Sequence, residues 1–469
     1  MTLSATQIQA IVDATKTPTP EQVRVVEAPR RPLLVVAGAG SGKTETMSMR
    51  VLWLLANHPD LTPASILGLT FTRKAAGELG DRLRERIRLL SRELPQLSER
   101  LDEDPVTLTY NSFAERIVSE HGMRIGIDPD FSMLSEAGAL DLMTQIVEAW
   151  PTDLDDDLSP AGVVGRVLHL AGEIAEHGYT VESARQALEG FGRELEIVGD
   201  SNKAAQELHQ ANQRRIAFLG PIEAYQKRKR EMGLLDFSDQ LVLATRIVRE
   251  VPSVRAALRE EFRAVLLDEF QDTSVIQMEL LSTLFGDHAV TAVGDPNQAI
   301  YGWRGASASS LETFLERFQT GAPEEGQTLT LSTAWRNDVS ILDAANRVAE
   351  PLREVASYQA GKEQLNAQSP VLVPRPGAGR GVVEIAYPAA YEDALAATVD
   401  FVRRVRAQPV TDGKRRTVAV LSRRRKDFPL IDAALREAGI PTEIVGLGGL
   451  LDQPAVQDVR AALELAYDV

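Results

Sequence analysis

The eight residues Ala37–Thr44 (AGAGSGKT) constrain this chain more than any other segment. An apolar run, Leu33–Val36, precedes them and a helical pattern follows, so they connect a buried strand to a helix. Their glycines free the backbone so that consecutive N–H groups can converge on phosphate oxygens. We therefore predict a nucleotide-phosphate loop made of Ala37, Gly38, Ala39, Gly40, Ser41, Gly42, Lys43 and Thr44.

Two side chains at the end of this loop supply the chemistry that a nucleotide requires. Lys43 can reach the β- and γ-phosphates of ATP, and the Thr44 hydroxyl can ligate Mg²⁺. Ala37 stands where the P-loop pattern has its first glycine. The alternative is a plain glycine turn between strand and helix, but Lys-Thr directly after the glycines favours the phosphate loop.

A second segment, Leu267–Asp272 (LDEFQD), ends an apolar strand in paired carboxylates. The carboxyl ends of strands are where α/β sheets place their chemistry. Asp268 would hold the magnesium ion, and Glu269 would polarise the attacking water as general base. An Asp-Glu pair at a strand end can also be a solvated loop, but the phosphate loop upstream favours the catalytic interpretation.

Composition narrows the class of protein. The 469 residues are 44% hydrophobic and include no cysteine, which excludes disulfide scaffolds, thiolate zinc sites and cysteine nucleophiles. There is no visible signal peptide and no apolar run long enough to span a membrane, so we expect a cytoplasmic protein without membrane contact. The net charge of −16 argues against a surface broadly coated by nucleic acid, although one local groove can still bind it.

The order of patterns along the chain predicts an α/β protein with a helical insertion. Strand patterns near the phosphate loop give way, from about residue 111 to 235, to long helical patterns without strand signals. Strand patterns resume at Ala264–Leu267 and Val290–Val293, and Gly321–Gln327 is the best candidate linker. A second βαβ-type region is then expected, with strands at Thr328–Leu331, Val382–Ala386, Val418–Ser422 and Glu443–Val445.

Several longer segments together resemble the superfamily 1A DNA helicases of the UvrD/Rep/PcrA type. They are similar, in order, to motifs Ia, II, III and IV: Thr70–Leu79 (TFTRKAAGEL), Leu267–Thr273 (LDEFQDT), Val293–Ala306 (VGDPNQAIYGWRGA) and Leu331–Asn337 (LSTAWRN). The resemblance runs from about Gln22 to Val469, and the helical insertion carries little of it. The local sequences GSGKTETM and LGLTFTRKAAGEL resemble those of helicase subunits in actinobacterial helicase–nuclease complexes. This resemblance implies a second helicase–nuclease subunit as a candidate partner.

This resemblance implies a P-loop, RecA-like parallel-sheet domain with an all-α insertion, followed by a partial second RecA-like domain. The expected ranges are 1–112 and 236–322 for the first domain, 113–235 for the insertion, and 323–469 for the start of the second domain. It implies an ATP- and Mg²⁺-dependent helicase or translocase that moves 3′ to 5′ on single-stranded DNA, acts at junctions with duplex, and serves repair or recombination. The family's motifs V and VI are not found, so we expect the chain as given to bind ATP and single strands without unwinding duplex.

The resemblance also assigns nucleotide contacts. Gln22 would read the adenine edge, although Thr19 and Gln22 also form a capping box at a helix start. Trp335 stands where the family has a tyrosine stacked on adenine, and its larger ring can take that role.

Three further residues bear on the phosphate end of the nucleotide. Arg336 would be the arginine finger, the alternative being a surface arginine paired with a carboxylate. Gln298 would sense the γ-phosphate. Glu45 stands where relatives carry arginine near the nucleotide, so we expect that contact to be missing.

Residues for a single-stranded DNA groove follow from the same resemblance. Aromatic rings that stack on bases, with arginine on phosphates, hold single strands without reading sequence. The expected DNA contacts are Phe71, Thr72, Lys74, Thr109, Ser112, Tyr301, Trp303 and Arg304. Asn111 replaces a histidine of relatives, and Asp236–Asp239 (DFSD) resembles an acidic stretch of the family but also fits a helix N-cap.

Two rival functions remain open from the sequence. A P-loop kinase or small-molecule ATPase would explain Ala37–Thr44 and Asp268-Glu269, but not the aromatic stretch Tyr301–Arg304. An ATP-gated single-stranded DNA-binding subunit or fragment, without unwinding activity of its own, would explain both. DNA-stimulated ATP hydrolysis separates the first rival from a helicase, and duplex unwinding separates the second.

Overall fold

The computed structural model describes residues 2–128, 130–152, 154, 158–198, 203–302, 305–306, 309–319, 327–359, 368–408, 416–445 and 454–467. The chain divides into two compact units, Met1–Gly381 and Val382–Val469. Over the described ranges, no helix has both the length and the apolar character that a membrane crossing needs.

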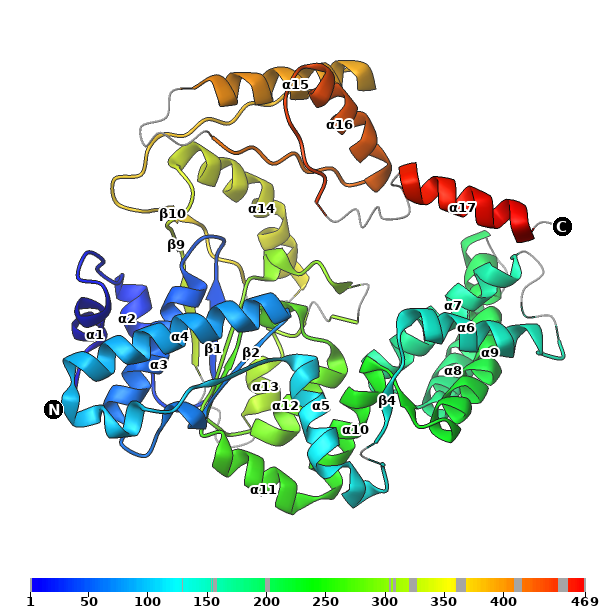
Figure 1. Ribbon diagram of the computed structural model, residues 1–469, viewed down its shortest axis with the longest axis horizontal. Helices are drawn as coiled ribbons and strands as arrows, with labels where there is room; N and C mark the ends of the chain where they lie inside the picture. The colour runs from blue at the N-terminus through cyan, green and yellow to red at the C-terminus, as the bar shows by residue number, and fades with distance from the viewer. Residues whose placement is uncertain are drawn as a thin grey trace. The chain divides into compact units, whose positions relative to one another are not determined.

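A six-stranded parallel sheet forms the centre of the first unit (Figure 1). Its strand order is β3-β2-β6-β7-β1-β8, and every neighbouring pair is parallel. The strands are β1 Leu33–Ala37, β2 Ile66–Thr70, β3 Val106–Thr109, β6 Ala264–Leu267, β7 Val290–Gly294 and β8 Gln327–Leu331. The predicted α/β class with a RecA-like parallel sheet is thereby confirmed. Because parallel strands point the same way, the loops after their carboxyl ends meet at one edge.

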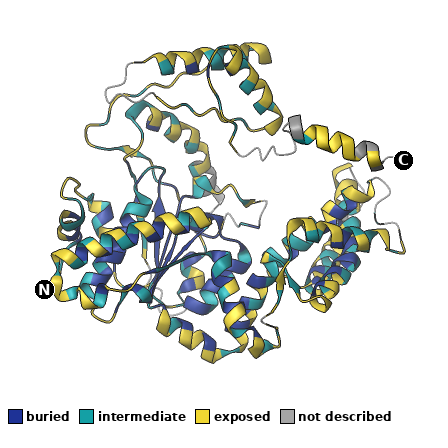
Figure 2. Cartoon of the chain, viewed as in Figure 1, coloured by how far each residue is buried: buried dark blue, intermediate teal, exposed yellow. Residues whose placement is uncertain are grey.

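Helices cover both faces of this sheet, and its strands β1, β2, β6 and β7 are buried along their whole length (Figure 2). One face packs against α1 Ala5–Val12, α2 Pro20–Val26, α3 Lys43–Asn57 and α4 Arg73–Glu93. The other packs against α5 Tyr110–His121, α10 Phe237–Glu250, α11 Pro252–Glu261, α12 Val275–Phe285 and α13 Phe314–Phe318. Within β1, Leu34 and Val36 pack into the core on one face of the sheet, and Leu33 and Val35 pack into the core on the other. Burial on both faces explains the continuous apolar runs in the sequence.

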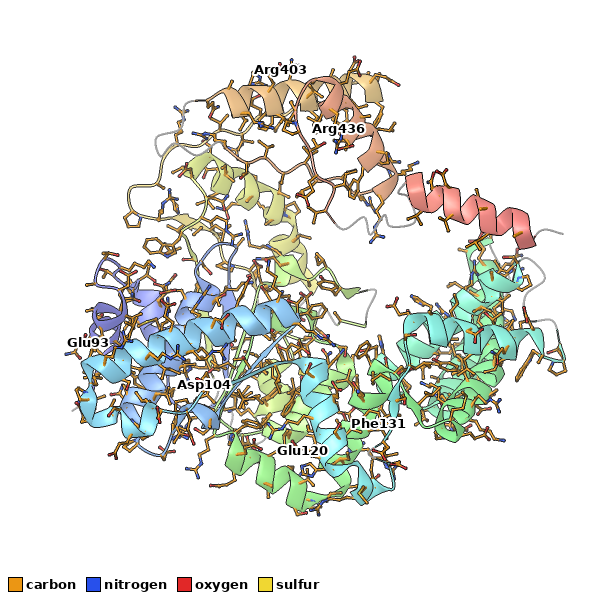
Figure 3. All side chains as sticks on the ribbon, viewed as in Figure 1. Glu93, Asp104, Glu120, Phe131, Arg403 and Arg436 are labelled. Carbon is orange, nitrogen blue, oxygen red and sulfur yellow. The ribbon has the colours of Figure 1, made fainter. Side chains whose placement is uncertain are left out.

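Between α5 and α10 in the sequence, four of the described helices form a separate layer. It consists of α6 Glu136–Glu148, α7 Pro160–Glu176, α8 Val181–Val198 and α9 Lys203–Glu231, which share a core of their own. Two short strands, β4 Ser132–Met133 and β5 Leu234–Leu235, pair at its root, where the sequence showed no strand signal. Phe131, labelled in Figure 3, packs against the sheet core just before β4.

Helix α5 belongs with the sheet, although the insertion was expected to begin at residue 113. Phe113 and Ile117 are fully buried in the same cluster as the strand residues Leu67 and Leu69. The expected boundary therefore falls inside a helix that the sheet needs for covering its face. The helices with their own core begin only at α6.

Strand β8 corrects a second expectation. The segment Thr328–Leu331 was predicted to open the second βαβ region, but it pairs in parallel with β1 along Leu33–Ala37. The physical reason is that β1, held by β7 on one side, has a free row of backbone groups on the other, and β8 satisfies them. After β8, the strands β9 Thr333–Ala334 and β10 Val373–Pro374 pair with each other, and helix α14 spans Val339–Gln359.

The second unit contains α15 Tyr391–Ala407, α16 Phe428–Glu437 and α17 Pro454–Tyr467. Its small core includes Val402, Leu435 and Ile440. The strands predicted at Val382–Ala386, Val418–Ser422 and Glu443–Val445 are not strands in the described residues of this unit. A strand needs a partner for its backbone groups and a layer for its side chains; here Ile385, Leu421 and Val445 are largely exposed instead.

Candidate nucleotide and nucleic-acid site

The phosphate loop connects β1 to α3 at the carboxyl edge of the sheet. Gly40 and Gly42 have φ angles of 74° and 82°, a left-handed conformation that glycine adopts without steric cost. Helix α3 begins at Lys43, and no side chain caps its N-terminus. The loop therefore leaves first-turn N–H groups of a 15-residue helix for an anion.

Three residues predicted to contact the nucleotide surround this loop. A Cβ atom added at Gly40 would lie 2.9 Å from Cβ of Arg336. One added at Gly42 would lie 3.1 Å from Nε2 of Gln22 and 3.9 Å from Cδ1 of Trp335. The backbone N–H of Trp335 donates to the carbonyl of Gly40 at 2.8 Å. The fold thus brings residues from positions 22, 40–42 and 335–336 together.

Gln22 satisfies the capping box and also faces the loop. The Thr19 N–H donates to its Oε1 at 2.9 Å, and its own N–H donates to Thr19 Oγ1 at 3.2 Å. Both hydrogen bonds of the cap are present, so the capping interpretation is confirmed. Of the Gln22 side-chain amide, the cap uses only the oxygen. The Nε2 group lies on the side of Gly42. Trp335 is 40% exposed beside it, a ring face available for stacking.

The paired carboxylates follow β6 directly. Burial, reinforced by the neighbouring charge of Glu269, raises the pKa of Asp268 to about 6. Burial acts against ionisation of Glu269 as well, but the Lys43 ammonium outweighs it and holds the pKa of Glu269 below its ordinary value. Lys43 Nζ lies 2.8 Å from Glu269 Oε2. Glu269 also has a φ of 49°, which is uncommon for a residue with a side chain and typical of functional sites.

A chain of hydrogen bonds links Glu269 to Gln298. Gln271 Nε2 donates to Glu269 Oε2 at 2.9 Å, and the Asp295 N–H donates to Gln271 Oε1 at 3.1 Å. Gln298 Nε2 then donates to Asp295 Oδ2 at 2.6 Å, and Ser369 Oγ donates to Asp295 Oδ1 at 3.0 Å. Sequence reasoning quoted Gln271 and Asp295 within motifs but gave them no part in the site. The signal available was position: Asp295 follows β7 directly, and Gln271 is a polar residue four positions after the end of β6.

Glu45, which was expected to make no nucleotide contact, forms an ion pair within the protein. Its Oε2 accepts from Arg86 Nη2 of α4 at 2.6 Å. Both side chains are partly buried, and the pair links α3 to α4. The glutamate that replaces the arginine of relatives is therefore paired with an arginine on the neighbouring helix.

Residues predicted to contact DNA lie after the carboxyl ends of β2, β3 and β7. The rings of Phe71 and Tyr301 are in tilted contact, with their centroids 4.5 Å apart and an interplanar angle of 33°. Lys74 is largely exposed on the first turn of α4. The pair Trp303 and Arg304 lies outside the described residues.

The predicted hydroxyl contacts serve as helix caps in the structure. Thr72 Oγ1 accepts from the Ala75 N–H at the start of α4. Thr109 Oγ1 accepts from the Ser112 N–H and donates to Ser112 Oγ at 2.8 Å. Asn111, in place of the histidine of relatives, accepts a hydrogen bond from Gln277 of α12 at 3.2 Å.

The acidic stretch Asp236–Asp239 caps α10 and encloses a lysine. Asp236 and Asp239 form a capping box, which confirms the N-cap interpretation. Lys229 Nζ lies 2.5 Å from Asp236 Oδ2 and 2.6 Å from Asp239 Oδ2, and its side chain is only 5% exposed. This buried triad ties the end of α9 to the start of α10.

Two oxygen donors, Thr44 and Asp268, are candidates to bind a magnesium ion together with a nucleotide. No cluster of three or more His, Cys, Asp or Glu side chains in the described part of the chain is placed to hold a metal ion. Mg²⁺ at a nucleotide site needs only one or two protein oxygens, because phosphates and water complete its shell. The buried carboxylate of Asp268 and the hydroxyl of Thr44 are oxygen donors of this kind.

Comparisons with known proteins give the family of the chain. A family described as UvrD/REP helicase N-terminal domain matches residues 18–319. The chain is 31% identical to DNA helicase II of Escherichia coli over 331 residues, which is 70% of this chain and 40% of the relative. It is 25% identical over 448 residues to the ATP-dependent DNA helicase PcrA of Leuconostoc citreum, covering 95% of this chain and 52% of the relative. The chain thus spans about half the length, or less, of these curated relatives.

Proposed function

The chain belongs to the UvrD/REP helicase family, and on that premise we propose that it carries the ATP-hydrolysing motor of a DNA helicase. The single observation that carries the proposal is the meeting of three segments at Gly40–Gly42: the loop itself, Gln22, and the pair Trp335-Arg336. A plain glycine turn would not need an aromatic ring, an amide and the stem of an arginine beside it. In the same unit, Lys43 contacts the carboxylate Glu269.

In this proposal each residue has a chemical task. The backbone and Lys43 bind the β- and γ-phosphates, Trp335 stacks on adenine, and the Gln22 amide reads its edge. Glu269 orients and deprotonates the attacking water, while Arg336 stabilises charge that develops on the γ-phosphate. Gln298 reports on the γ-phosphate through Asp295 and Gln271. Mg²⁺ held by Thr44 and Asp268 would neutralise phosphate charge when bound.

The nucleic-acid partner proposed for the same edge is single-stranded DNA. The contacting rings of Phe71 and Tyr301 and the exposed Lys74 follow the strands β2 and β7 of one sheet, a combination suited to bases and phosphates without sequence reading. We propose movement from 3′ to 5′, action at junctions with duplex, and a cytoplasmic role in repair or recombination. A second helicase–nuclease subunit as partner rests on the local sequence resemblance alone.

The experiment compares Mg-ATP hydrolysis by the chain with and without oligo(dT). We expect hydrolysis that rises with oligo(dT) and is lost in Lys43→Ala. Hydrolysis that depends on Lys43 but ignores DNA would favour the small-molecule ATPase or kinase instead. With 3′-tailed and 5′-tailed duplexes, unwinding of the 3′-tailed substrate alone supports the proposed polarity. DNA and nucleotide binding with neither DNA-stimulated hydrolysis nor unwinding would favour the ATP-gated binding subunit.

A further inference from the structure

The end of helix α7 is a point where the helical insertion contacts the part of the unit that contains the six-stranded sheet. Glu176, the last residue of α7, accepts a hydrogen bond on Oε1 from Ser238 Oγ of α10 at 3.1 Å. Burial raises the pKa of Glu176, and the nearby hydroxyl of Ser274, the N-cap of α12, opposes that rise. One carboxylate of the insertion is therefore bonded at the start of α10 and lies near the start of α12, where Ser274 follows Glu269 by five residues.

The same side chain contacts the loop that follows β7. Gly305 has a φ of 75°, and a Cβ atom added to it would lie 2.6 Å from Cβ of Glu176 and 3.3 Å from its Cγ. Glycine is needed there twice: for the left-handed backbone and for the approach of the Glu176 stem. Gly305 comes directly after the Trp303-Arg304 pair that we predict to contact DNA.

The loop around Gly305 is joined in turn to the catalytic segment. Ala306 forms an antiparallel bridge with Ser274. Ser310 Oγ donates to the carbonyl of Thr273 at 3.0 Å in a buried position. The Ile300 N–H donates to Asp272 Oδ1. Ile300, Ala306 and Ser310 are therefore each tied to residues 272–274, and Glu176 packs against Gly305 beside them.

The neighbouring corner of the insertion rests on α12. A Cβ atom added at Gly178, whose φ is 72°, would lie 3.2 Å from Glu279 Oε2 and 3.7 Å from Ile276 Cδ1. Burial raises the pKa of Glu176, with Asp236 adding to the rise and His177 opposing it. A carboxylate kept in such surroundings, rather than an apolar side chain, is costly for stability unless its hydrogen bonds serve a purpose.

We propose that Glu176 is a positioning residue that couples strand binding near Tyr301 to the nucleotide site, by fixing the helical insertion against Ser238 and Gly305. The inference rests on the proposed function. Strand engagement that shifts the insertion or Gly305 must move Glu176. The bridge between Ala306 and Ser274 transmits that movement to the segment that begins with Asp268 and Glu269. Coupling of this kind is a free energy that each ligand exerts on the other's binding.

The test measures that coupling in the full chain. The affinity for fluorescent oligo(dT) is determined with and without Mg²⁺ and a non-hydrolysable ATP analogue, and the ratio of the two dissociation constants is the coupling factor. We expect wild type to show roughly fivefold coupling or more, the lower end of typical linked sites. Glu176→Ala should bring the factor to within about twofold of one, a readout that loss of stability alone would not change.

Two variants sharpen the result. Glu173→Ala removes an exposed carboxylate one turn earlier on α7, paired only loosely with His169, and should keep wild-type coupling. Glu176→Gln keeps an oxygen acceptor for Ser238 and should retain most of it. Wild-type coupling in Glu176→Ala, equal loss in Glu176→Gln and Glu176→Ala, equal loss in Glu173→Ala, or a wild-type factor of one with both ligands bound would overturn the inference. Wild type that binds neither ligand would instead overturn the proposed function.

Discussion

Lys43 Nζ lies 2.8 Å from Glu269 Oε2, so the proposed phosphate cation and the proposed general base form an ion pair across 226 residues of sequence. Each residue sits just after a central strand, β1 or β6, and the parallel sheet places both at one edge. The Lys43 charge keeps Glu269 ionised despite its burial. A change at either residue therefore alters the electrostatics of the other, and this coupling gives the first two predictions their direction.

Glu269→Gln should slow ATP hydrolysis by roughly 10²–10⁴-fold, the usual contribution of a general base. The same change frees Lys43 from its carboxylate, so affinity for Mg-ATP should stay equal or increase. Single-turnover hydrolysis and calorimetric titration measure the two effects. As a control, Glu261→Gln removes an exposed carboxylate that pairs with Arg116 and should change neither. Nearly unchanged turnover in Glu269→Gln would show that another group activates the water.

Lys43→Ala should abolish detectable ATP binding while the fold remains, because the phosphates lose their cation and Glu269 keeps an uncompensated negative charge. Calorimetry measures the binding, and circular dichroism checks the fold. Lys16→Ala, which removes an exposed lysine paired with Asp13, is the matched control and should bind ATP as wild type does. Retained millimolar or tighter affinity in Lys43→Ala would argue strongly against the phosphate-loop assignment.

Phe71→Ala and Tyr301→Ala should each weaken single-stranded DNA binding by about 1–3 kcal/mol, as expected for a lost stacking surface. Because the two rings contact each other at 4.5 Å, removing one also withdraws support from the other. The double variant should therefore lose less than the sum of the two single losses. Fluorescence titration with oligo(dT) and oligo(dA) gives all three values. A loss of DNA affinity that depends strongly on the base, or no loss, would show that the two rings serve only in packing.

The sequence sufficed where a local pattern determines the structure. Strand β1, the loop at Gly40–Gly42 and the carboxylates after β6 follow from apolar runs, glycines and the residues at strand ends. It failed where the outcome depends on a distant partner. Nothing within Thr328–Leu331 indicates that the strand pairs with β1, and Val418–Ser422 has a strand pattern without a neighbour to pair with.

The site shows the same division. Lys43 and Glu269 were predicted from their motifs, and their direct contact is a result of the sheet order. Asp295 and Gln271 were missed because their role is to connect other residues, and a hydrogen bond between positions 24 residues apart leaves no periodic trace. Glu176 was missed for the same reason, since a single glutamate at a helix end is common on protein surfaces.

Asp268→Asn should stabilise the fold while it removes Mg²⁺-dependent hydrolysis. Burial raises the pKa of Asp268 from 3.8 to about 6, so the folded state holds a proton that the unfolded state releases between these values. Stability of the wild type should therefore fall as pH rises from about 4 to 6, by up to roughly 3 kcal/mol from this group. Asparagine carries no charge and avoids the fall. Thermal unfolding at pH 4.5 and pH 8 measures it, and a variant less stable than wild type at pH 8 would contradict the argument.

Lys229→Ala decides whether the acidic stretch at Asp236 and Asp239 acts in structure or in DNA contact. Removing the buried ammonium leaves two carboxylates close together without a counter-charge, which typically costs about 3–5 kcal/mol. Lys227→Ala, on the same helix, removes an exposed lysine paired with Glu231 and should cost no more than about 0.5 kcal/mol. Urea denaturation measures both, and oligo(dT) titration under native conditions should show unchanged DNA affinity for the folded fraction of each. If Lys229→Ala instead kept its stability and lost DNA binding, the triad would belong to the DNA groove, because only a ligand could then account for keeping two carboxylates around a buried lysine.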